Sequence, residues 1–163
     1  ADCITRAEPL LGEAVFWLGD GPACHGPLPA AKALQRLGQE CDTLVFNAFS
    51  GFHPDAFGAL AGTLRAGGLL LLLTPPREIW PAYPDPDRLR LVAQPEDAKL
   101  AGHGFIARLV RLLTGDPALS LNPPSAVSPG VLLTQAGHSV PIKPVRCRPS
   151  TKYCMVIAVV RWC

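Results

Sequence analysis

The sequence predicts an α/β fold, a three-layer Rossmann-like domain with a mainly parallel sheet. Predicted strands and helices alternate through the first half of the chain, and this order is typical of parallel strands joined by crossover helices. The apolar runs expected to form strands are continuous rather than alternating, which indicates burial on both faces of the sheet. A chain of 163 residues, 48% of them hydrophobic, is long enough to bury one such core.

The pattern begins with residues 14–18, a short apolar run that predicts a strand and ends at a turn, Gly19 to Pro22. Residues 29–37 then place alanines and leucines at helical spacing, and Gly38 suits the end of a helix. Residues 43–46 are rich in β-branched and aromatic side chains, which favours a second strand. We therefore expect a strand, a helix and a strand in this order.

The next segments repeat the order. Residues 56–64 carry apolar side chains at helical spacing, and we expect Gly67-Gly68 to stop that helix. Leu69 to Leu73 is a continuous apolar run that predicts a third strand. Residues 75–86 form a proline-rich loop, and residues 105–113 predict a further helix with its arginines facing outward.

Charge is distributed unevenly along the chain. The net charge is +2, yet all 13 acidic residues lie at or before Asp116, whereas the residues after Asn122 include five basic ones and no acid. This break divides the chain into a predicted domain, residues 1–121, and a linker with a basic tail, residues 122–163. No apolar run is long enough to span a bilayer and no signal segment opens the chain, so we expect a soluble, cytoplasmic protein that binds no membrane.

The turn after the first predicted strand lies where a nucleotide-binding loop is found in such folds. The spacing of Gly19, Gly21 and Gly26 matches neither the dinucleotide fingerprint nor the phosphate-binding loop, which also needs a lysine followed by serine or threonine. We interpret this segment as a plain turn. The six cysteines are scattered without a Cys-x-x-Cys pair, so they predict ordinary thiols rather than a zinc site or a disulfide scaffold.

A serine, a histidine and an aspartate lie within six residues of one another at Ser50, His53 and Asp55. A catalytic triad uses these residue types but needs them to converge in space, and the Gly-x-Ser-x-Gly signature is absent. Because Pro54 suits the first position of a helix, we expect these side chains to cap that helix.

Two blocks of sequence carry a resemblance to a known family. The first reads Val45-Phe46-Asn47-Ala48, Gly51-Phe52, Ala56-Phe57, Ala59-Leu60, Gly62-Thr63-Leu64 and Ala66-Gly67. The second reads Glu78-x-Trp80 and then Pro84-Asp85-x-Asp87-x-Leu89-Arg90. In these blocks the chain resembles the N-terminal domain of the bacterial tRNA(Met) cytidine acetyltransferases, and weaker similarity continues from Phe105 to Leu121.

The resemblance implies that the full-length enzyme makes N4-acetylcytidine at the wobble position of elongator methionine tRNA, using acetyl-CoA and ATP. Its helicase-like ATPase module and its acetyltransferase module would follow this domain, and none of their motifs is present in the sequence. We therefore expect a non-catalytic fragment, truncated before Ala14, that holds no cofactor and no metal. Its expected role is to position tRNA or to brace the ATPase module.

Basic and aromatic side chains are the candidates for contact with RNA or with a neighbouring domain. They are Arg65, Trp80, Arg88, Arg90, Arg108 and Arg111. Arginine suits phosphate through its planar donor fork, and aromatic rings stack on bases. On a net-acidic domain we expect weak or no tRNA binding by this chain alone. Asp85 and Asp87 could act as an acid and base pair or hold a metal, but Arg88 and Arg90 alongside favour solvated ion pairs. For the aromatic rings the alternative is local packing.

The acid-free composition of the tail does not resemble the family. Permissible codons for Cys147 to Cys163, read one base earlier, yield a sequence similar to the family's linker helix and the strand before its phosphate-binding loop. We therefore interpret the tail as out of frame. The alternative is a genuine terminal strand at Met155 to Val160, which is apolar and β-branched enough to pair with a sheet edge.

Two other functions stay open from the sequence. One is a stand-alone α/β domain for small-ligand binding or signalling, which requires residues near Gly19, Asn47 and Thr74 to converge on a pocket at the strand ends. The other is a secreted, disulfide-bonded protein, which would show fewer than six free thiols.

Overall fold

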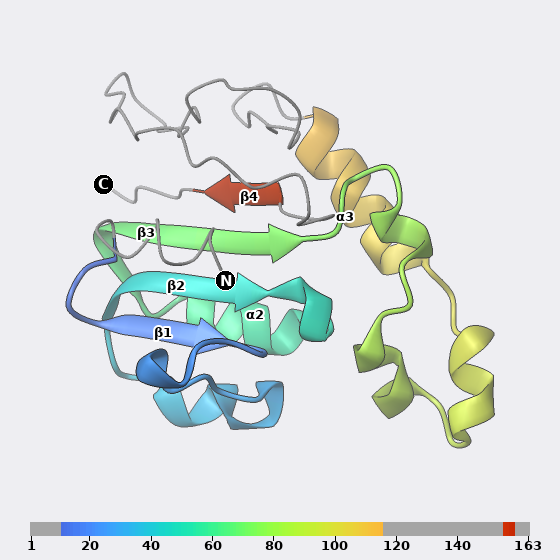
Figure 1. Ribbon diagram of the computed structural model, residues 1–163, viewed down its shortest axis with the longest axis horizontal. Helices are drawn as coiled ribbons and strands as arrows, with labels where there is room; N and C mark the ends of the chain where they lie inside the picture. Colours follow the sequence, from blue (N-terminus) through green and yellow to red (C-terminus); the bar gives the residue numbers. More distant parts are fainter. Residues whose placement is uncertain (1–10, 116–154, 159–163) are drawn as a thin grey trace.

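The computed structural model describes residues 11–115 and 155–158 of the chain. Its centre is a four-stranded sheet in the order β1-β2-β3-β4 (Figure 1). The strands are β1 (Val15–Leu18), β2 (Cys41–Asn47), β3 (Leu64–Thr74) and β4 (Met155–Ala158). The first three are parallel to one another and β4 is antiparallel to β3. The predicted α/β fold with a mainly parallel sheet is therefore confirmed.

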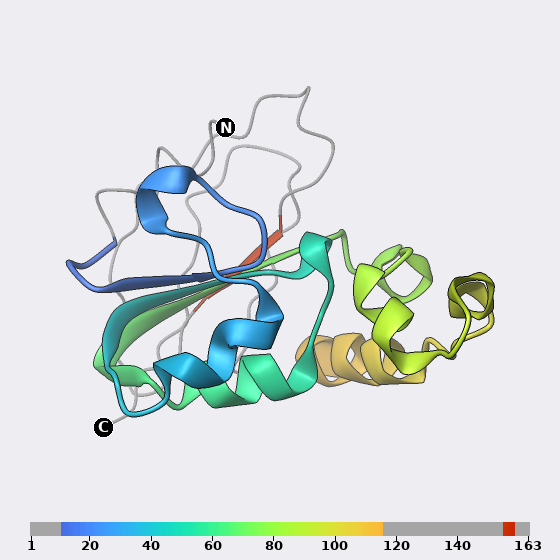
Figure 2. The same ribbon diagram turned by 90° about the horizontal axis from the view of Figure 1, so that it is seen from below.

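Alternate residues of the three parallel strands face opposite sides of the sheet, and both sides are apolar. The larger cluster includes Phe16, Leu44 and Phe46, and the smaller one consists of Trp17, Val45 and Leu71. Figure 2 shows α2 (Pro54–Ala61) and the 3₁₀ helix η3 (Ala30–Arg36) on one side of the sheet, and the single turn η2 (Ala23–His25) on the other. Burial on both faces explains why the strands read as continuous apolar runs.

The predicted helix at residues 29–37 forms, but as a 3₁₀ helix rather than an α-helix. It begins after Pro29 and is followed by Gly38, whose φ of 82° is a left-handed value. Only Ala33 is buried, whereas Leu34 and Leu37 remain 63% and 54% exposed. With so little apolar surface buried, the packing that usually favours a regular α-helix is missing.

The prediction that the helix at residues 56–64 continues to Gly67-Gly68 is wrong. Helix α2 ends at Ala61, and β3 already begins at Leu64 and includes the glycine pair. Leu64 lies opposite Cys41 and Leu69 opposite Thr43, so the residues between Leu64 and Leu69 bulge out of the ladder. The φ of Gly67 in this bulge is 79°, a conformation that glycine adopts without strain.

Beyond the parallel strands, residues 75–115 form an extension at the carboxyl ends of the strands (Figure 1). It contains three short 3₁₀ helices, η5 (Trp80–Ala82), η6 (Pro86–Leu91) and η7 (Pro95–Lys99), and the helix α3 (Gly104–Gly115). The predicted helix at 105–113 is thus confirmed, with Ile106 buried against the core. None of the helices in the described residues is long and apolar enough to cross a membrane.

Of the predicted tail, the structure describes only β4. It pairs with the end of β3, with Leu71 opposite Ala158 and Thr74 opposite Met155. A strand thus forms at Met155–Ala158, within the range Met155 to Val160 in which the sequence allowed one. The boundary at residue 121 and the out-of-frame interpretation lie outside the described residues and stay predictions.

Candidate functional site

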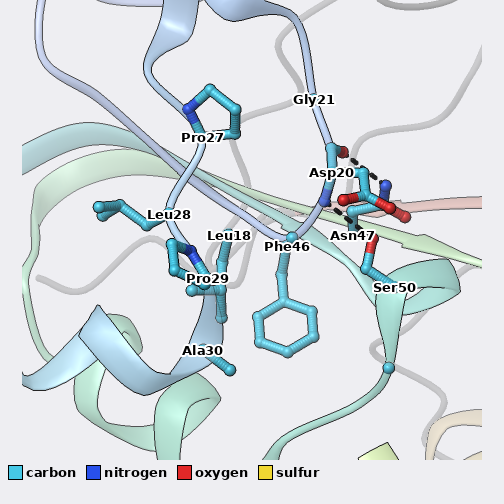
Figure 3. A pocket seen from close by; sticks show the side chains of 12 residues that line it. Leu18, Asp20, Gly21, Pro27, Leu28, Pro29, Ala30, Phe46, Asn47 and Ser50 are labelled. Atoms are coloured by element: carbon cyan, nitrogen blue, oxygen red, sulfur yellow. Dashed lines mark hydrogen bonds between the residues drawn. The ribbon is translucent and has the colours of Figure 1, made fainter. Parts of the chain in front are cut away.

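A hollow of about 390 Å³ lies beyond the carboxyl ends of β1 and β2 (Figure 3). Its walls come from three segments that are distant in the sequence: the turn after β1, the stretch before η3, and the turn after β2. The lining residues are Leu18, Gly19, Asp20, Gly21, Pro27, Leu28, Pro29, Ala30, Phe46, Asn47, Ser50 and Gly51. In open α/β sheets this edge is the usual place for a ligand.

Two side chains of this hollow, those of Ser50 and Asn47, are hydrogen-bonded to the backbone of Asp20. The amide of Asp20 donates to Ser50 Oγ at 2.8 Å, and Asn47 Nδ2 donates to the carbonyl of Asp20 at 2.7 Å. Gly19 has a φ of 86°, and a Cβ there would lie 2.9 Å from the carbonyl oxygen of Asn47. The turn therefore requires glycine because two strand ends approach closely, and not because a phosphate does.

The charge of the hollow also argues against an anionic ligand. The lining includes the carboxylate of Asp20 and no lysine or arginine, so a phosphate group would meet a like charge without a compensating cation. These residues do not fit ATP or acetyl-CoA. The plain-turn interpretation of Gly19, Gly21 and Gly26 agrees with this geometry.

The stand-alone ligand-binding alternative requires residues near Gly19, Asn47 and Thr74 to converge on a pocket, and Thr74 does not meet this requirement. Gly19 and Asn47 line the hollow, whereas Thr74 ends β3 outside it. Thr74 is fully buried, and its hydroxyl has no hydrogen-bond partner among the described residues. Two strand ends rather than three therefore form the hollow, and the stand-alone ligand-binding alternative is not favoured.

The three triad-like residues lie at two different structural features, the turn after β1 and the start of α2. His53 is the N-cap of α2, and its Nδ1 accepts from the amide of Ala56 at 3.3 Å. Ser50 instead accepts from the amide of Asp20. Asp55 lies in the first turn of α2, where a carboxylate is favourable for the helix dipole. The predicted capping role is thus confirmed for His53, while Ser50 stabilises the turn after β1.

Three of the candidate arginines are engaged with the domain itself. Arg65 contacts the Asp42 carboxylate at 2.9 Å, and Arg90 Nε donates to Asp87 at 3.0 Å. That hydrogen bond to Asp87 raises the pKa of Arg90. Arg88 donates to the carbonyl of Tyr83 at 3.1 Å. The predicted ion pair with the loop carboxylates is confirmed for Arg90 and Asp87.

The other two candidate arginines, Arg108 and Arg111, lie on the exposed face of α3 as predicted. Within the described residues neither forms a salt bridge. Arg111 lies three positions after Arg108, so the two side chains lie on the same face of the helix. Of the five candidate arginines, these two therefore have their guanidinium groups most available for phosphate.

Trp80 is not available to RNA or to another domain. Its side chain is 2% exposed, and its ring lies 6.0 Å from that of Phe52 in an edge-to-face arrangement. Phe105 of α3 also packs on Phe52, with ring centroids 5.7 Å apart. The local-packing alternative is the correct one for Trp80, because this ring joins the extension to the sheet.

Asp85, for which the sequence predicted an ion pair, forms no salt bridge among the described residues and instead stabilises the same joint. Asp85 is the N-cap of η6 and accepts from the amide of Asp87 at 2.9 Å. Its Oδ1 also accepts from the amide of Phe52 at 3.1 Å, across 33 residues of chain. The Asp85-Pro86 pair is a typical helix start, so the cap was readable from the sequence, whereas the contact with Phe52 was not.

The described residues contain no group of three or more potential metal ligands close enough to hold an ion. Cys24 and Cys41, the cysteines within the described part of the chain, are free thiols. The remaining four cysteines lie outside it. In this part of the chain the side chains thus offer neither a metal centre nor a disulfide.

The fold and these contacts define a Rossmann-like α/β domain whose polar side chains mainly stabilise its own turns. Its particular family follows from comparison with known proteins. Residues 5–122 match the family described as "tRNA(Met) cytidine acetyltransferase TmcA, N-terminal". This match covers well over half of the chain, so the chain belongs to the family of TmcA N-terminal regions.

Individual relatives agree with this assignment. The chain is 44% identical over 116 residues to the tRNA(Met) cytidine acetyltransferase TmcA of Nitrosococcus halophilus, which covers 68% of this chain and 16% of that protein. It is 42% identical over 122 residues to the Salmonella typhimurium TmcA, covering 71% and 17%. The chain thus spans about one sixth of the length of these relatives. No solved structure matches this chain.

Proposed function

We propose that this chain is the non-catalytic N-terminal domain of a cytoplasmic tRNA(Met) cytidine acetyltransferase. The parent enzyme would make N4-acetylcytidine at the tRNA wobble position from acetyl-CoA, with ATP hydrolysed by a separate module. The observation that carries the proposal is the match of residues 5–122 to the N-terminal region of that family. The occupied polar groups at the strand ends support a role other than catalysis.

We infer that any contact with tRNA runs through α3. Arg108 and Arg111 are exposed, lie on one face of the helix, and have no carboxylate partner among the described residues. Arg65 and Arg90 would first have to leave an aspartate. Two arginines contribute only part of an RNA footprint, so binding by this chain alone is weak and salt-dependent.

The extension also suits contact with the remainder of the parent protein, its ATPase module in particular. Leu89, Leu91 and Leu100 are 56%, 61% and 83% exposed, and all belong to the 3₁₀ helices or the residue after them. Exposed apolar side chains gathered on one part of a domain favour burial against another protein surface. The relatives supply that surface, because about five sixths of their length lies outside the match.

The first experiment measures binding of the full chain to labelled elongator methionine tRNA by fluorescence anisotropy at several salt concentrations. We expect a Kd on the order of 10 to 100 µM near physiological salt. The double variant Arg108→Ala/Arg111→Ala should flatten the slope of log affinity against log salt by about 1.5. The control Lys32→Ala/Lys99→Ala removes the same charge from exposed positions on other helices.

Equal slopes for the arginine variant and the lysine control would contradict the contact through α3. Tight binding that persists at high salt would contradict the supporting role of the domain. A separate assay incubates the chain with tRNA, acetyl-CoA and ATP and measures N4-acetylcytidine by mass spectrometry. We expect none, and acetylation by this chain alone would overturn the non-catalytic assignment.

A further inference from the structure

The edge of β3 that faces β4 differs from its other edge. Toward β2, β3 is paired from Leu64 to Leu73. Toward β4, it is paired only over Leu71–Thr74. The pairing with β4 is also antiparallel, in a sheet whose other pairs are parallel (Figure 1). β3 is therefore the last strand of the parallel sheet, and β4 is an addition to its edge.

The composition of this edge favours strand addition. The part of β3 that pairs with β4, Leu71–Thr74, lies at the end of a run of five leucines, Leu69 to Leu73, and contains no charged residue or proline. Natural sheets protect free edges with lysine, proline, bulges or short strands. Here the bulge and Arg65 lie at the start of β3, so the edge at the carboxyl end lacks such protection within its own sequence.

The strand that pairs with this edge, β4, is short and contains no charged residue. Met155-Val156-Ile157-Ala158 pairs residue by residue with Thr74 to Leu71, and its composition is typical of a segment that adds to a sheet through main-chain hydrogen bonds. Between α3 and β4 lie residues 116–154. A chain of that length reaches at most about 130 Å, enough to join β4 to the β3 of its own chain or of a neighbouring copy.

We propose that the edge of β3 at Leu71–Thr74 is a strand-accepting site, and that a second copy of this chain can fill it with its own Met155–Ala158. In the single chain, β4 occupies the site and keeps it closed. At high concentration two copies exchange β4 reciprocally, each strand pairing antiparallel with the partner's β3. This inference is independent of the tRNA-related function.

The test uses a labelled peptide of residues 151–161 with Cys154→Ser, which keeps Lys152 and Arg161 for solubility. The peptide is titrated into the full chain and into the full-length variant Ile157→Pro, because proline weakens strand pairing. We expect the variant to bind the peptide at least about ten-fold more tightly, since its own β4 no longer competes at a high effective concentration. Ile157→Val keeps the strand and should bind like the parent chain.

Hydrogen exchange locates the binding and works in the parent chain, even if Ile157→Pro fails to fold. Excess peptide should expose the amides of Met155–Ala158 to exchange while Leu71–Thr74 stay protected. Equal peptide affinity of the parent and a folded Ile157→Pro variant, or protection that appears elsewhere, would overturn the strand-accepting site. Sedimentation of the parent chain should reveal a dimer that grows with concentration, and a strictly monomeric chain would overturn the role of a second copy.

Discussion

Two regions of the molecule are stabilised in different ways: the sheet body, residues 11–74, and the extension, residues 75–115. In the body, every parallel strand contributes buried side chains to both faces of the sheet. In the extension beyond Pro76, the buried side chains are Trp80 and Ile106, and both face the body. The body is therefore stabilised by its own core, whereas the extension depends on a few anchors that dock it onto that core.

This difference explains where function can reside. A segment that packs little against itself leaves its leucines and arginines exposed, as Leu100 and Arg111 are. The body offers a hollow in which the side chains of Asn47 and Ser50 are already hydrogen-bonded to the backbone of Asp20. The proposed contact with a partner is therefore assigned to the extension, and the following predictions test how far the two regions are separable.

The largest expected effect is on the body. Phe46 is 1% exposed and packs against Phe52 and Phe57, with ring centroids 5.0 and 5.2 Å away. Phe46→Ala should lower the free energy of unfolding by about 4 kcal/mol, through lost burial and the cavity that remains. Urea denaturation followed by circular dichroism measures this loss, and a change below about 1 kcal/mol would mean that the body core is not the main source of stability.

Removing the main anchor should separate the two regions. Trp80→Ala deletes the buried ring that joins the extension to Phe52, at a cost of about 3 kcal/mol. We expect the amides of residues 77–115 to exchange with solvent much faster, while those of β2 keep their protection. Equal loss of protection in both regions would show that they unfold as one unit.

The carboxylate at the joint should have a smaller effect. Asp85 accepts from the amides of Asp87 and Phe52, so Asp85→Ala removes both a helix cap and a link to the body. We expect a loss of about 1 to 2 kcal/mol in the free energy of unfolding. Asp97→Ala, on the first turn of η7, is a control that removes the same charge without a described contact to the body.

The body should also weaken at high pH through Cys41. Burial raises the pKa of this thiol above its ordinary value of 9.0, so the folded state holds the proton more tightly than the unfolded state does. Its contribution is fully present below pH 9 and is lost as the pH rises through the folded pKa, at up to about 1.4 kcal/mol per pH unit. Cys41→Ala should show a shallower decline of stability above pH 9 in urea denaturation.

The smallest effect is expected at the exposed leucines. Leu100 is 83% exposed, so Leu100→Ala should change the free energy of unfolding by less than about 0.5 kcal/mol. The same substitution should nevertheless weaken binding to the remainder of a relative, such as the Nitrosococcus halophilus protein without its matched region. Calorimetry measures that binding, and unchanged affinity would argue against a contact through Leu100.

The strands and the amphipathic helix of this protein could be predicted from its sequence alone. Continuous apolar runs such as Leu69 to Leu73 report double-sided burial, and the spacing of Ile106 and Leu109 places Arg108 on the outward face of α3. These features are local, because the period of a strand or a helix is written in neighbouring residues. Family membership was readable for the same reason, in short blocks of adjacent residues.

Contacts between residues distant in the chain could be assigned only from the folded structure. Trp80 was a candidate for contact with RNA, but its ring packs against Phe52 in the structure. Asp85 was predicted to form an ion pair, but its carboxylate accepts a hydrogen bond from the amide of Phe52. The glycine pair at Gly67-Gly68 reads as a helix stop, yet the pairing of Leu64 with Cys41 draws it into the sheet. A local sequence pattern indicates that a side chain favours burial or a hydrogen bond. Only the folded chain determines which other residue packs against that side chain or forms the hydrogen bond.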